Sequence, residues 1–494
     1  MSNNLNDSKL LRGVNSFLAW SQKGTAFFFD GEFLNCSSNQ NFPRSENNKE
    51  QKSETSCVSK SSLIYEYFLQ NIEKIVNFWA FLLLFLSIFA NSETLGMCTF
   101  LGFFALLSKY LFKKGETIEI DKIDFFVIIY VILFTLSTFW SSWFFDSMHG
   151  LIKTYTYFFA YLIFKDIFKT KPLIKLCYIM FLGLLCSVEA IICLKQQIIG
   201  VEAIAGWQDM TNIDPSQAMT RVFGTLKPLN PNLMAGYFIS TFPCLLALSF
   251  YNFKTKSLEI WRFSFNKNFL FILCAILTFF ATIFTGCRGS YIALLAQIML
   301  VCILSYYIIW QEFSFSKSLK KIWLLTVGFC FLCILVGIFS SEALQTRILS
   351  IFSSREDSSN SFRMNVYQSS FQILKDNFLI GIGAGNWTFR EVYGLYMKTG
   401  FDALGAYSVP LEIAVETGVF GLINFIMLIF FSLKKAIMTF IVAPYNTKIL
   451  MTVPILTMIG MMLHGIIDTV WFRPQLQFVF WLMIAFLSTK NEEN

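Results

Sequence analysis

Arginine occurs in this sequence in segments that border long apolar runs. The arginines concerned are Arg221, Arg288, Arg347, Arg355, Arg363, Arg390 and Arg473. A guanidinium group is planar and permanently charged, and it binds phosphate or carboxylate through parallel hydrogen bonds. The chemistry expected of such a set is therefore the binding of anions.

The first candidate segment runs from Arg221 to Asn232 and leads directly into an apolar run. Its prolines and asparagines predict a turn at the membrane surface. Arg221 and Lys227 would then lie near the level of the lipid head groups. Two interpretations are open, because the segment is either an anion-binding loop or an ordinary loop whose cations reach lipid phosphates.

The second candidate is the hairpin Thr285-Gly-Cys-Arg288-Gly-Ser290, which joins two apolar runs. Glycines on both sides of Arg288 allow a ligand to approach the backbone closely. A single cation at this tip opposes the expected topology, and it therefore favours a functional role over a topological one.

The third candidate segment begins with a predicted amphipathic helix from Ser361 to Leu374, with Ser361 as its cap and Arg363 in its first turn. A glycine-rich turn, Gly381–Asn386, and Arg390 follow. The glycine spacing does not match the dinucleotide-binding fingerprint. The turn is either a backbone nest for an anion or a tight turn that returns the chain to the membrane.

The fourth candidate contains two carboxylates on one helix face, Glu412 and Glu416, shortly after Tyr407. Carboxylates at or just below a membrane surface are costly and are functional candidates. The alternative is an ion pair with one of the arginines. The fifth candidate, His464-Gly-Ile-Ile-Asp468, is followed by Arg473.

The few histidines argue against metal or triad chemistry, and neither a metal nor a cofactor is expected. The chain has 2 histidines, His149 and His464, and most of its 12 cysteines lie inside apolar runs. Cys330 and Cys333 form a CxxC pair, but no second pair completes a metal site.

Composition places these segments in a membrane protein. The 494 residues are 55% hydrophobic and only 14% charged, whereas a soluble domain carries roughly 25% charged residues. The net charge of +7 does not indicate nucleic acid as a partner, because most of the lysines lie in short clusters between apolar runs. We predict an all-α polytopic membrane protein with about 12 transmembrane helices and one large extracytoplasmic loop.

The predicted spans divide the chain into regions. They are 75–90, 95–112, 125–145, 151–168, 173–194, 233–251, 269–285, 291–310, 322–339, 409–433, 449–467 and 476–487. The predicted regions are a polar, disordered cytoplasmic segment (1–74), N-terminal helices (75–200), a membrane domain (201–488) that includes an outer loop (340–407), and a cytoplasmic tail (489–494). No signal peptide is apparent, so the first span would direct insertion.

Lysine clusters on alternate loops predict that both termini are cytoplasmic. Examples are Lys113 and Lys114, Lys254 and Lys256, and Lys434 and Lys435. The arginine segments then all lie on the outer side, and we expect Arg221 and Arg288 to converge there beneath the loop with Arg363. The expected location is the plasma (inner) membrane, with the thylakoid membrane as an alternative.

The five segments, in this order, resemble the O-antigen ligase and polymerase (Wzy/WaaL-type) superfamily of the bacterial cell envelope, from about Arg221 to Leu487. Within it, Gly381–Asn386, Ala403–Ser408, Leu411–Gly418 and Trp471–Gln477 look like the cyanobacterial IctB family, which is labelled an inorganic-carbon (bicarbonate) transporter. Superfamily ligases carry a histidine as the proposed base at the position of Tyr407. A phenol with a pKa near 10 is a poor base at neutral pH, so that role does not carry over.

The resemblance implies metal-independent transfer of a glycan from polyprenyl pyrophosphate. It implies catalytic roles for Arg221, Arg288, Glu412 and Glu416, and substrate-binding roles for Arg363, Lys227, Asn232, Arg390, Tyr407, Asp468 and Arg473. Glu391 and Asp402 are further candidates for the base. The partners would be membrane lipid and the lipid-linked glycan. Two alternatives remain, a bicarbonate transporter or accessory protein and an inactive scaffold that binds lipid-linked sugar.

Overall fold

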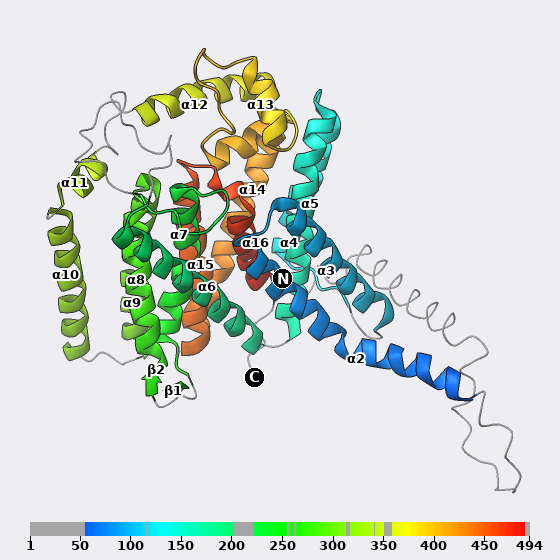
Figure 1. The fold of residues 1–494 in the computed structure, drawn as a ribbon, viewed down its shortest axis with the longest axis horizontal. Helices are drawn as coiled ribbons and strands as arrows, with labels where there is room; N and C mark the ends of the chain where they lie inside the picture. The colour runs from blue at the N-terminus through cyan, green and yellow to red at the C-terminus, as the bar shows by residue number, and fades with distance from the viewer. Residues whose placement is uncertain are drawn as a thin grey trace, which may run out of the picture.

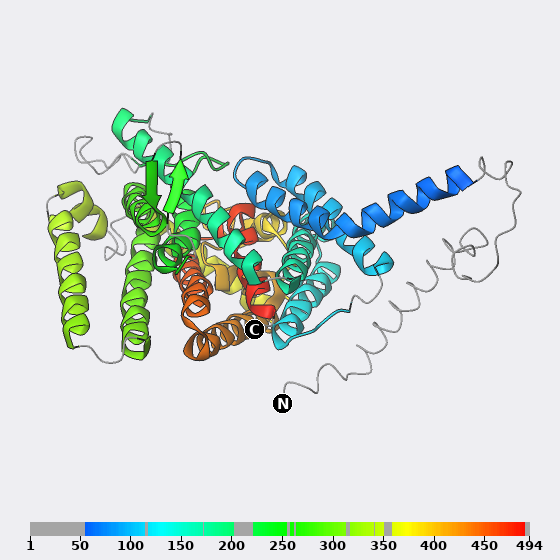
Figure 2. The ribbon, with the colours of Figure 1, turned by 90° about the horizontal axis from the view of Figure 1, so that it is seen from below.

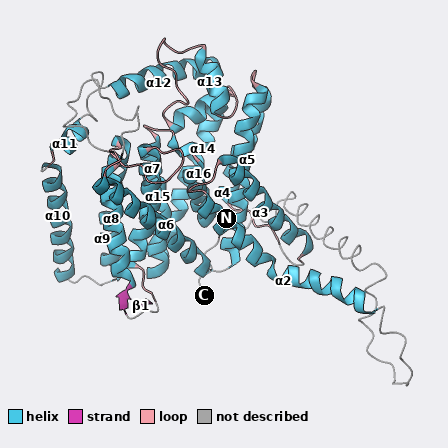
Figure 3. Ribbon diagram, in the orientation of Figure 1, coloured by secondary structure: helices cyan, strands magenta, loops and turns pink. Residues whose placement is uncertain are grey.

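The computed structural model describes residues 55–113, 117–170, 172–201, 221–253, 257–260, 263–312, 317–339, 341–349 and 358–489. Within these ranges the regular structure is helical apart from one short two-stranded hairpin (Figure 3). The hairpin pairs β1 (Ser257–Ile260) with β2 (Phe263–Asn266) in antiparallel register.

Each predicted span falls on a helix. These helices are α2 (Thr55–Leu86), α3 (Ser92–Phe112), α4 (Lys122–Trp140), α5 (Phe144–Thr170), α6 (Pro172–Ile199), α7 (Pro231–Phe250), α8 (Lys267–Phe284), α9 (Arg288–Glu312), α10 (Lys317–Phe339), α14 (Val409–Val442), α15 (Tyr445–Gly465) and α16 (Pro474–Ser488). Among the described residues, 8 helices are long and apolar enough to cross a membrane. The prediction of an all-α polytopic membrane protein is confirmed.

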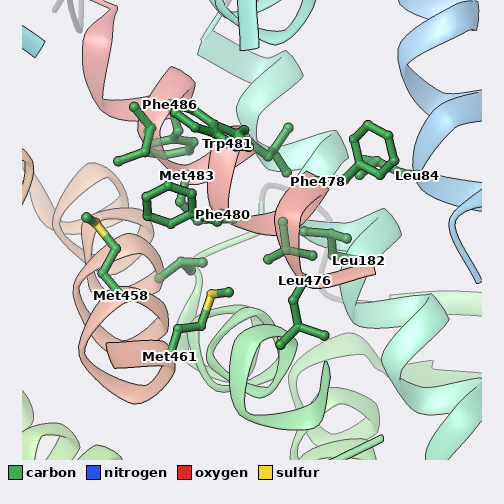
Figure 4. Packing of buried hydrophobic residues seen from close by; sticks show 14 of the residues in the cluster. Leu84, Leu182, Met458, Met461, Leu476, Phe478, Phe480, Trp481, Met483 and Phe486 are labelled. Atoms are coloured by element: carbon green, nitrogen blue, oxygen red, sulfur yellow. The ribbon is translucent and has the colours of Figure 1, made fainter. Parts of the chain in front are cut away.

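Helices α7, α15 and α16 form the centre of the bundle (Figure 1). Every residue of α16 from Gln475 to Ser488 is buried. Its ring Phe480 lies beside Met458 and Met461 of α15 (Figure 4), and Trp481 packs against Tyr130 and Tyr161. The other long helices surround this buried centre and form the perimeter of the bundle.

The perimeter helices expose large apolar side chains. Phe100 of α3, Phe139 of α4, Met299 of α9 and Phe430 of α14 are each more than half exposed. Apolar surface on this scale suits hydrocarbon as the surrounding solvent. Helix α10 stands at one edge of the bundle beside α9 (Figure 1).

Short helices gather at one end of the bundle. They are α11 (Glu342–Leu349), α12 (Ser358–Asp376) and α13 (Asn386–Gly394), whereas the β hairpin lies at the opposite end (Figure 1). Helices α12 and α13 share a small core with the start of α14 that includes Val366, Phe389 and Val415. We refer to this end as the α12–α13 end.

Two predicted boundaries are corrected. Helix α2 begins at Thr55 and projects from the bundle (Figure 2), inside the segment 1–74 that was predicted to be disordered. The apolar residues of the stretch Leu63–Leu69 extend the helical pattern of the first span and account for the earlier start. Residues 1–54 lie outside the described part of the chain. The predicted helix from Ser361 is α12, which starts at Ser358.

Candidate functional site

Two cavities lie at the α12–α13 end and share the lining residues Asn232 and Asp468. The larger has a volume of about 640 Å³ and is lined from α4, α5, α13, α14 and the segment before α16. The smaller has a volume of about 50 Å³. We call them the large cavity and the arginine cavity. Because they share residues, a ligand can contact both.

Four arginines from four segments line the arginine cavity. They are Arg221 before α7, Arg288 at the start of α9, Arg347 in α11 and Arg363 in α12. The predicted convergence of Arg221, Arg288 and Arg363 is therefore found. Arg347 was not among the predicted site residues, although it belongs to the same set of arginines in the sequence.

Arg221 is fixed by hydrogen bonds from two nitrogens of its guanidinium group. Its Nε donates to the carbonyl of Thr285 at 2.9 Å, and its Nη2 donates to Asn232 Oδ1 at 2.6 Å. Burial and the nearby Arg347 lower the pKa of Arg221 to about 10, so it remains charged at neutral pH. Gly286 has a φ of +64°, and a Cβ there would lie 3.1 Å from the Arg221 side chain. The Gly-Cys-Arg-Gly hairpin thus makes room for Arg221.

Asp468 links Arg363 to Arg221 by way of Asn232. It accepts a hydrogen bond from Asn232 Nδ2 at 2.9 Å and forms an ion pair with Arg363 at 3.6 Å. Arg363 Nε is buried without a hydrogen-bond partner among the described residues, and the guanidinium lies 5.9 Å from the centroid of the Tyr407 ring. One donor of Arg363 therefore remains for a ligand. His464, one turn before Asp468, lies 3.5 Å from Cys287 Sγ.

Helix α6 holds the loop that carries Arg221. Gln196 Oε1 accepts from the backbone N–H groups of Phe223 and Gly224, and its Nε2 donates to the Gly224 carbonyl. Glu189 Oε2 accepts from the Thr225 N–H at 3.0 Å. No local sequence pattern indicates this clamp, because Gln196 and Glu189 contact backbone groups that lie 27 and 36 positions further along the chain.

Replacing Gln196 with alanine should weaken anion binding without unfolding the protein. Loss of hydrogen bonds to the Arg221 loop, worth about 1 kcal/mol each, predicts a roughly tenfold weaker affinity for inorganic pyrophosphate. Gln197→Ala is the matched control, because Gln197 Oε1 has no hydrogen-bond partner among the described residues. Calorimetric titration and thermal unfolding of both variants provide the check. Equal affinity in the two variants would contradict a positioning role for Gln196.

The glycine-rich turn binds an internal carboxylate. The N–H groups of Ile382 and Gly383 donate to backbone carbonyls of α14, and the Gly385 N–H donates to Glu416 Oε1 at 2.9 Å. Gly381 has a φ of +79°, and a Cβ there would lie 2.4 Å from the Glu416 carbonyl. Of the two open interpretations, the structure shows the tight turn. It packs against the first turns of α14.

Glu412 and Glu416 both line the large cavity and are buried, with 4% and 3% exposure. Glu412 Oε2 accepts from the Ala406 N–H at 3.0 Å. Among the described residues neither carboxylate forms an ion pair with an arginine, which was the alternative explanation of their position. Gly418, two residues after Glu416, has a φ of +72°, kinks α14 and packs against Leu379.

Tyr407 lines the large cavity but is a protonated phenol at neutral pH. Burial and the nearby Asp468 carboxylate raise the pKa of Tyr407 above its ordinary value. The residue has a φ of +52°, which is uncommon outside glycine. Its carbonyl accepts from the Tyr367 hydroxyl at 3.2 Å. The side chain can donate a hydrogen bond, but a raised pKa excludes it as the base near pH 7.

Some predicted site residues lie elsewhere. Lys227 is exposed, and its carbonyl accepts a hydrogen bond from Gln475 Nε2 at 2.9 Å. Arg390 pairs with exposed Asp402 at 3.5 Å. Neither Lys227 nor Arg390 lines either cavity, whereas Arg473 lines the large one. The large cavity also contains Lys153 of α5, which the sequence did not single out because it lies within a predicted span.

Residues 273–426 match the O-antigen ligase family. The match runs from α8 into α14 and so includes Arg288, Arg347, Arg363 and both carboxylates, Glu412 and Glu416. It supports the resemblance to the Wzy/WaaL-type superfamily over this part of the chain. No curated protein sequence matches. The matched region thus supplies three of the four arginines of the arginine cavity, while Arg221, Asn232, Ile467 and Asp468 come from outside it.

Proposed function

We propose that the protein transfers a glycan from a polyprenyl pyrophosphate carrier to an acceptor hydroxyl at the α12–α13 end. The observation that carries the proposal is the convergence of Arg221, Arg288, Arg347 and Arg363 on one cavity, next to a larger cavity with two buried carboxylates. The O-antigen ligase match supports the same class of reaction.

In this proposal the arginine cavity binds the pyrophosphate of the donor. Pyrophosphate leaves with additional negative charge when its bond to the anomeric carbon breaks. Guanidinium groups that are already fixed, as Arg221 is by Thr285 and Asn232, stabilise that charge with little reorganisation. The polyprenyl chain would lie in the lipid beside the bundle.

The base in this proposal is Glu412 or Glu416. The acceptor oxygen bonds to the anomeric carbon, the bond to pyrophosphate breaks, and the hydroxyl proton passes to a carboxylate. Asp468 is less suited, because it is paired with Arg363 and bonded to Asn232. Tyr407 is excluded by its raised pKa. Glu391 and Asp402 are exposed and line neither cavity.

The membrane orientation belongs to the same proposal. Lysines gather towards the opposite end, where Lys109 pairs with Asp166, Lys165 with Asp124 and Lys435 with Asp121. The positive-inside tendency then places the α12–α13 end outside and both termini in the cytoplasm. A site facing the cell envelope suits a lipid-linked glycan.

Replacing Tyr407 with phenylalanine should leave the pH dependence of transfer unchanged between pH 6 and 9. The raised pKa keeps the phenol protonated throughout that range, so its ionisation cannot shape the profile. We expect the rate to fall at most about fivefold, for one lost neutral hydrogen bond of about 1 kcal/mol. Initial rates of the two proteins across the range provide the check. A rate that rises with pH in the wild type but not in Tyr407→Phe would contradict this assignment.

The test of the proposed function is a paired assay on the reconstituted protein. One arm measures turnover of a polyprenyl-pyrophosphate-linked oligosaccharide, and the other measures uptake of labelled bicarbonate into liposomes. We expect glycan turnover without bicarbonate flux above that of protein-free liposomes. Bicarbonate flux without glycan turnover would reject the proposal in favour of an IctB-type transporter.

A further inference from the structure

The large cavity contains a pair of cations that the arginine cavity does not share. Lys153 comes from α5, and Arg473 immediately precedes α16. The two residues are distant in sequence and lie on different elements, yet both line the same cavity. Neither lines the arginine cavity. The α12–α13 end therefore has two separate groups of positive charge.

Lys153 and Arg473 differ from the other cations in what they contact. Arg363 pairs with Asp468, and Arg221 donates to Asn232. In the described part of the chain, the side chains of Lys153 and Arg473 form no hydrogen bond or ion pair. Two like charges facing one cavity repel each other unless an anion lies between them.

The carboxylates of the large cavity do not neutralise this pair by direct contact. Glu416 accepts from the Gly385 N–H, and Glu412 accepts from the Ala406 N–H. Asp468 is paired with Arg363. Each carboxylate is thus held by a partner other than Lys153 or Arg473. Lys153 and Glu416 influence each other through space, as do Arg473 and Glu412, but no carboxylate of the described residues occupies the hydrogen-bond donors of Lys153 or Arg473. Those donors are available to a ligand.

We propose that Lys153 and Arg473 form a second anion-binding subsite, which takes an anionic group carried by the glycan acceptor. The inference rests on the proposed function, in which the arginine cavity holds the donor. The same cavity is lined by Tyr157, Trp387 and Trp481, and aromatic rings pack well against the apolar faces of sugars. An acceptor bound there would lie in the cavity that contains Glu412 and Glu416.

Two sources can supply the anion. One is the carboxylate of an acidic sugar within the acceptor, and the other is the phosphate of a second lipid carrier. Both place negative charge within reach of an ammonium and a guanidinium group. The subsite therefore predicts an acceptor that is charged near its reacting end, in contrast to a neutral glycan.

The test uses the full-length protein in lipid nanodiscs and three soluble probes. They are inorganic pyrophosphate, a tetrasaccharide that contains uronic acid, and a neutral tetrasaccharide. If the anion is a sugar carboxylate, the wild type should bind the acidic tetrasaccharide about tenfold more tightly than the neutral one. The neutral tetrasaccharide lacks the carboxylate and therefore one charge-assisted hydrogen bond. If it is a carrier phosphate, the protein should instead bind a second equivalent of pyrophosphate.

Lys153→Gln and Arg473→Gln should each remove the preference for the acidic probe, or the second equivalent of pyrophosphate. Binding of the first equivalent should remain as in the wild type. Lys153→Arg should restore what Lys153→Gln removes, which separates loss of charge from loss of folding. The control is Lys375→Gln, because Lys375 is an exposed cation of α12 that lines neither cavity.

Arg288→Gln reports on the proposed function separately, because it should abolish the first equivalent and spare the Lys153 site. If Arg288→Gln still binds the first equivalent of pyrophosphate as the wild type does, the proposed donor site is wrong. The second subsite is then judged from Lys153→Gln and Arg473→Gln alone. If Lys153→Gln and Arg473→Gln both bind every probe with the same affinity and stoichiometry as the wild type, the second subsite is overturned.

Discussion

Replacing Arg288 with lysine should lower glycan transfer about 30- to 1000-fold, although the positive charge is kept. Arg288 is 8% exposed and lines the arginine cavity together with Arg221. Lysine offers a point charge where arginine offers a planar fork, and loss of one charge-assisted bond to a developing anion costs roughly 2–4 kcal/mol. Single-turnover rates with a polyprenyl-linked oligosaccharide provide the measurement.

The result must be separated from misfolding, because Arg288 begins helix α9. Thermal unfolding and elution volume of Arg288→Lys should match those of the wild type. A folded variant that keeps wild-type turnover would show that positive potential alone is sufficient. That outcome would contradict the need for a planar guanidinium group at position 288 during departure of the pyrophosphate.

Replacing the base with glutamine should lower the rate about 100- to 10,000-fold, the usual contribution of a positioned base. Glu412→Gln and Glu416→Gln are measured separately, since one of them should show this loss and the other a smaller one. Glutamine keeps a carbonyl oxygen, so it can still accept from the Ala406 or the Gly385 N–H. Binding of pyrophosphate should be retained in both variants.

The control for these variants is Glu391→Gln, because Glu391 is exposed on α13 and lines neither cavity. We expect it to transfer glycan at the wild-type rate. If both Glu412→Gln and Glu416→Gln also transfer at close to the wild-type rate, no carboxylate of the pair acts as base. The mechanism proposed here would then be wrong in its acceptor half.

The sequence predicted the spans and most of the arginine cavity for physical reasons. Long apolar runs identify spans because hydrocarbon requires them. Arginine opposite the lysine-rich loops identified Arg221, Arg288 and Arg363, because topology gave no other reason for their positions. Tyr407 was judged a poor base from the ordinary pKa of a phenol, and its burial strengthens that judgement.

The remaining features depend on tertiary contacts that no local pattern encodes. Arg347 reaches the arginine cavity only because α11 lies beside the Gly286 hairpin, where its Nε donates to the Gly286 carbonyl. The Gly385 N–H is occupied by Glu416 although the two residues are 31 positions apart. Lys153 lies in a predicted span, and the sequence does not indicate that its side chain lines a cavity.

A cryo-electron microscopy map of the protein with bound polyprenyl pyrophosphate tests the central claim most directly. We expect density for the pyrophosphate in the arginine cavity, in contact with Arg288 and Arg221, and density for a lipid chain that leaves towards the membrane. Pyrophosphate density bound elsewhere on the protein, with the four arginines still turned towards one another and free of ligand, would contradict the account.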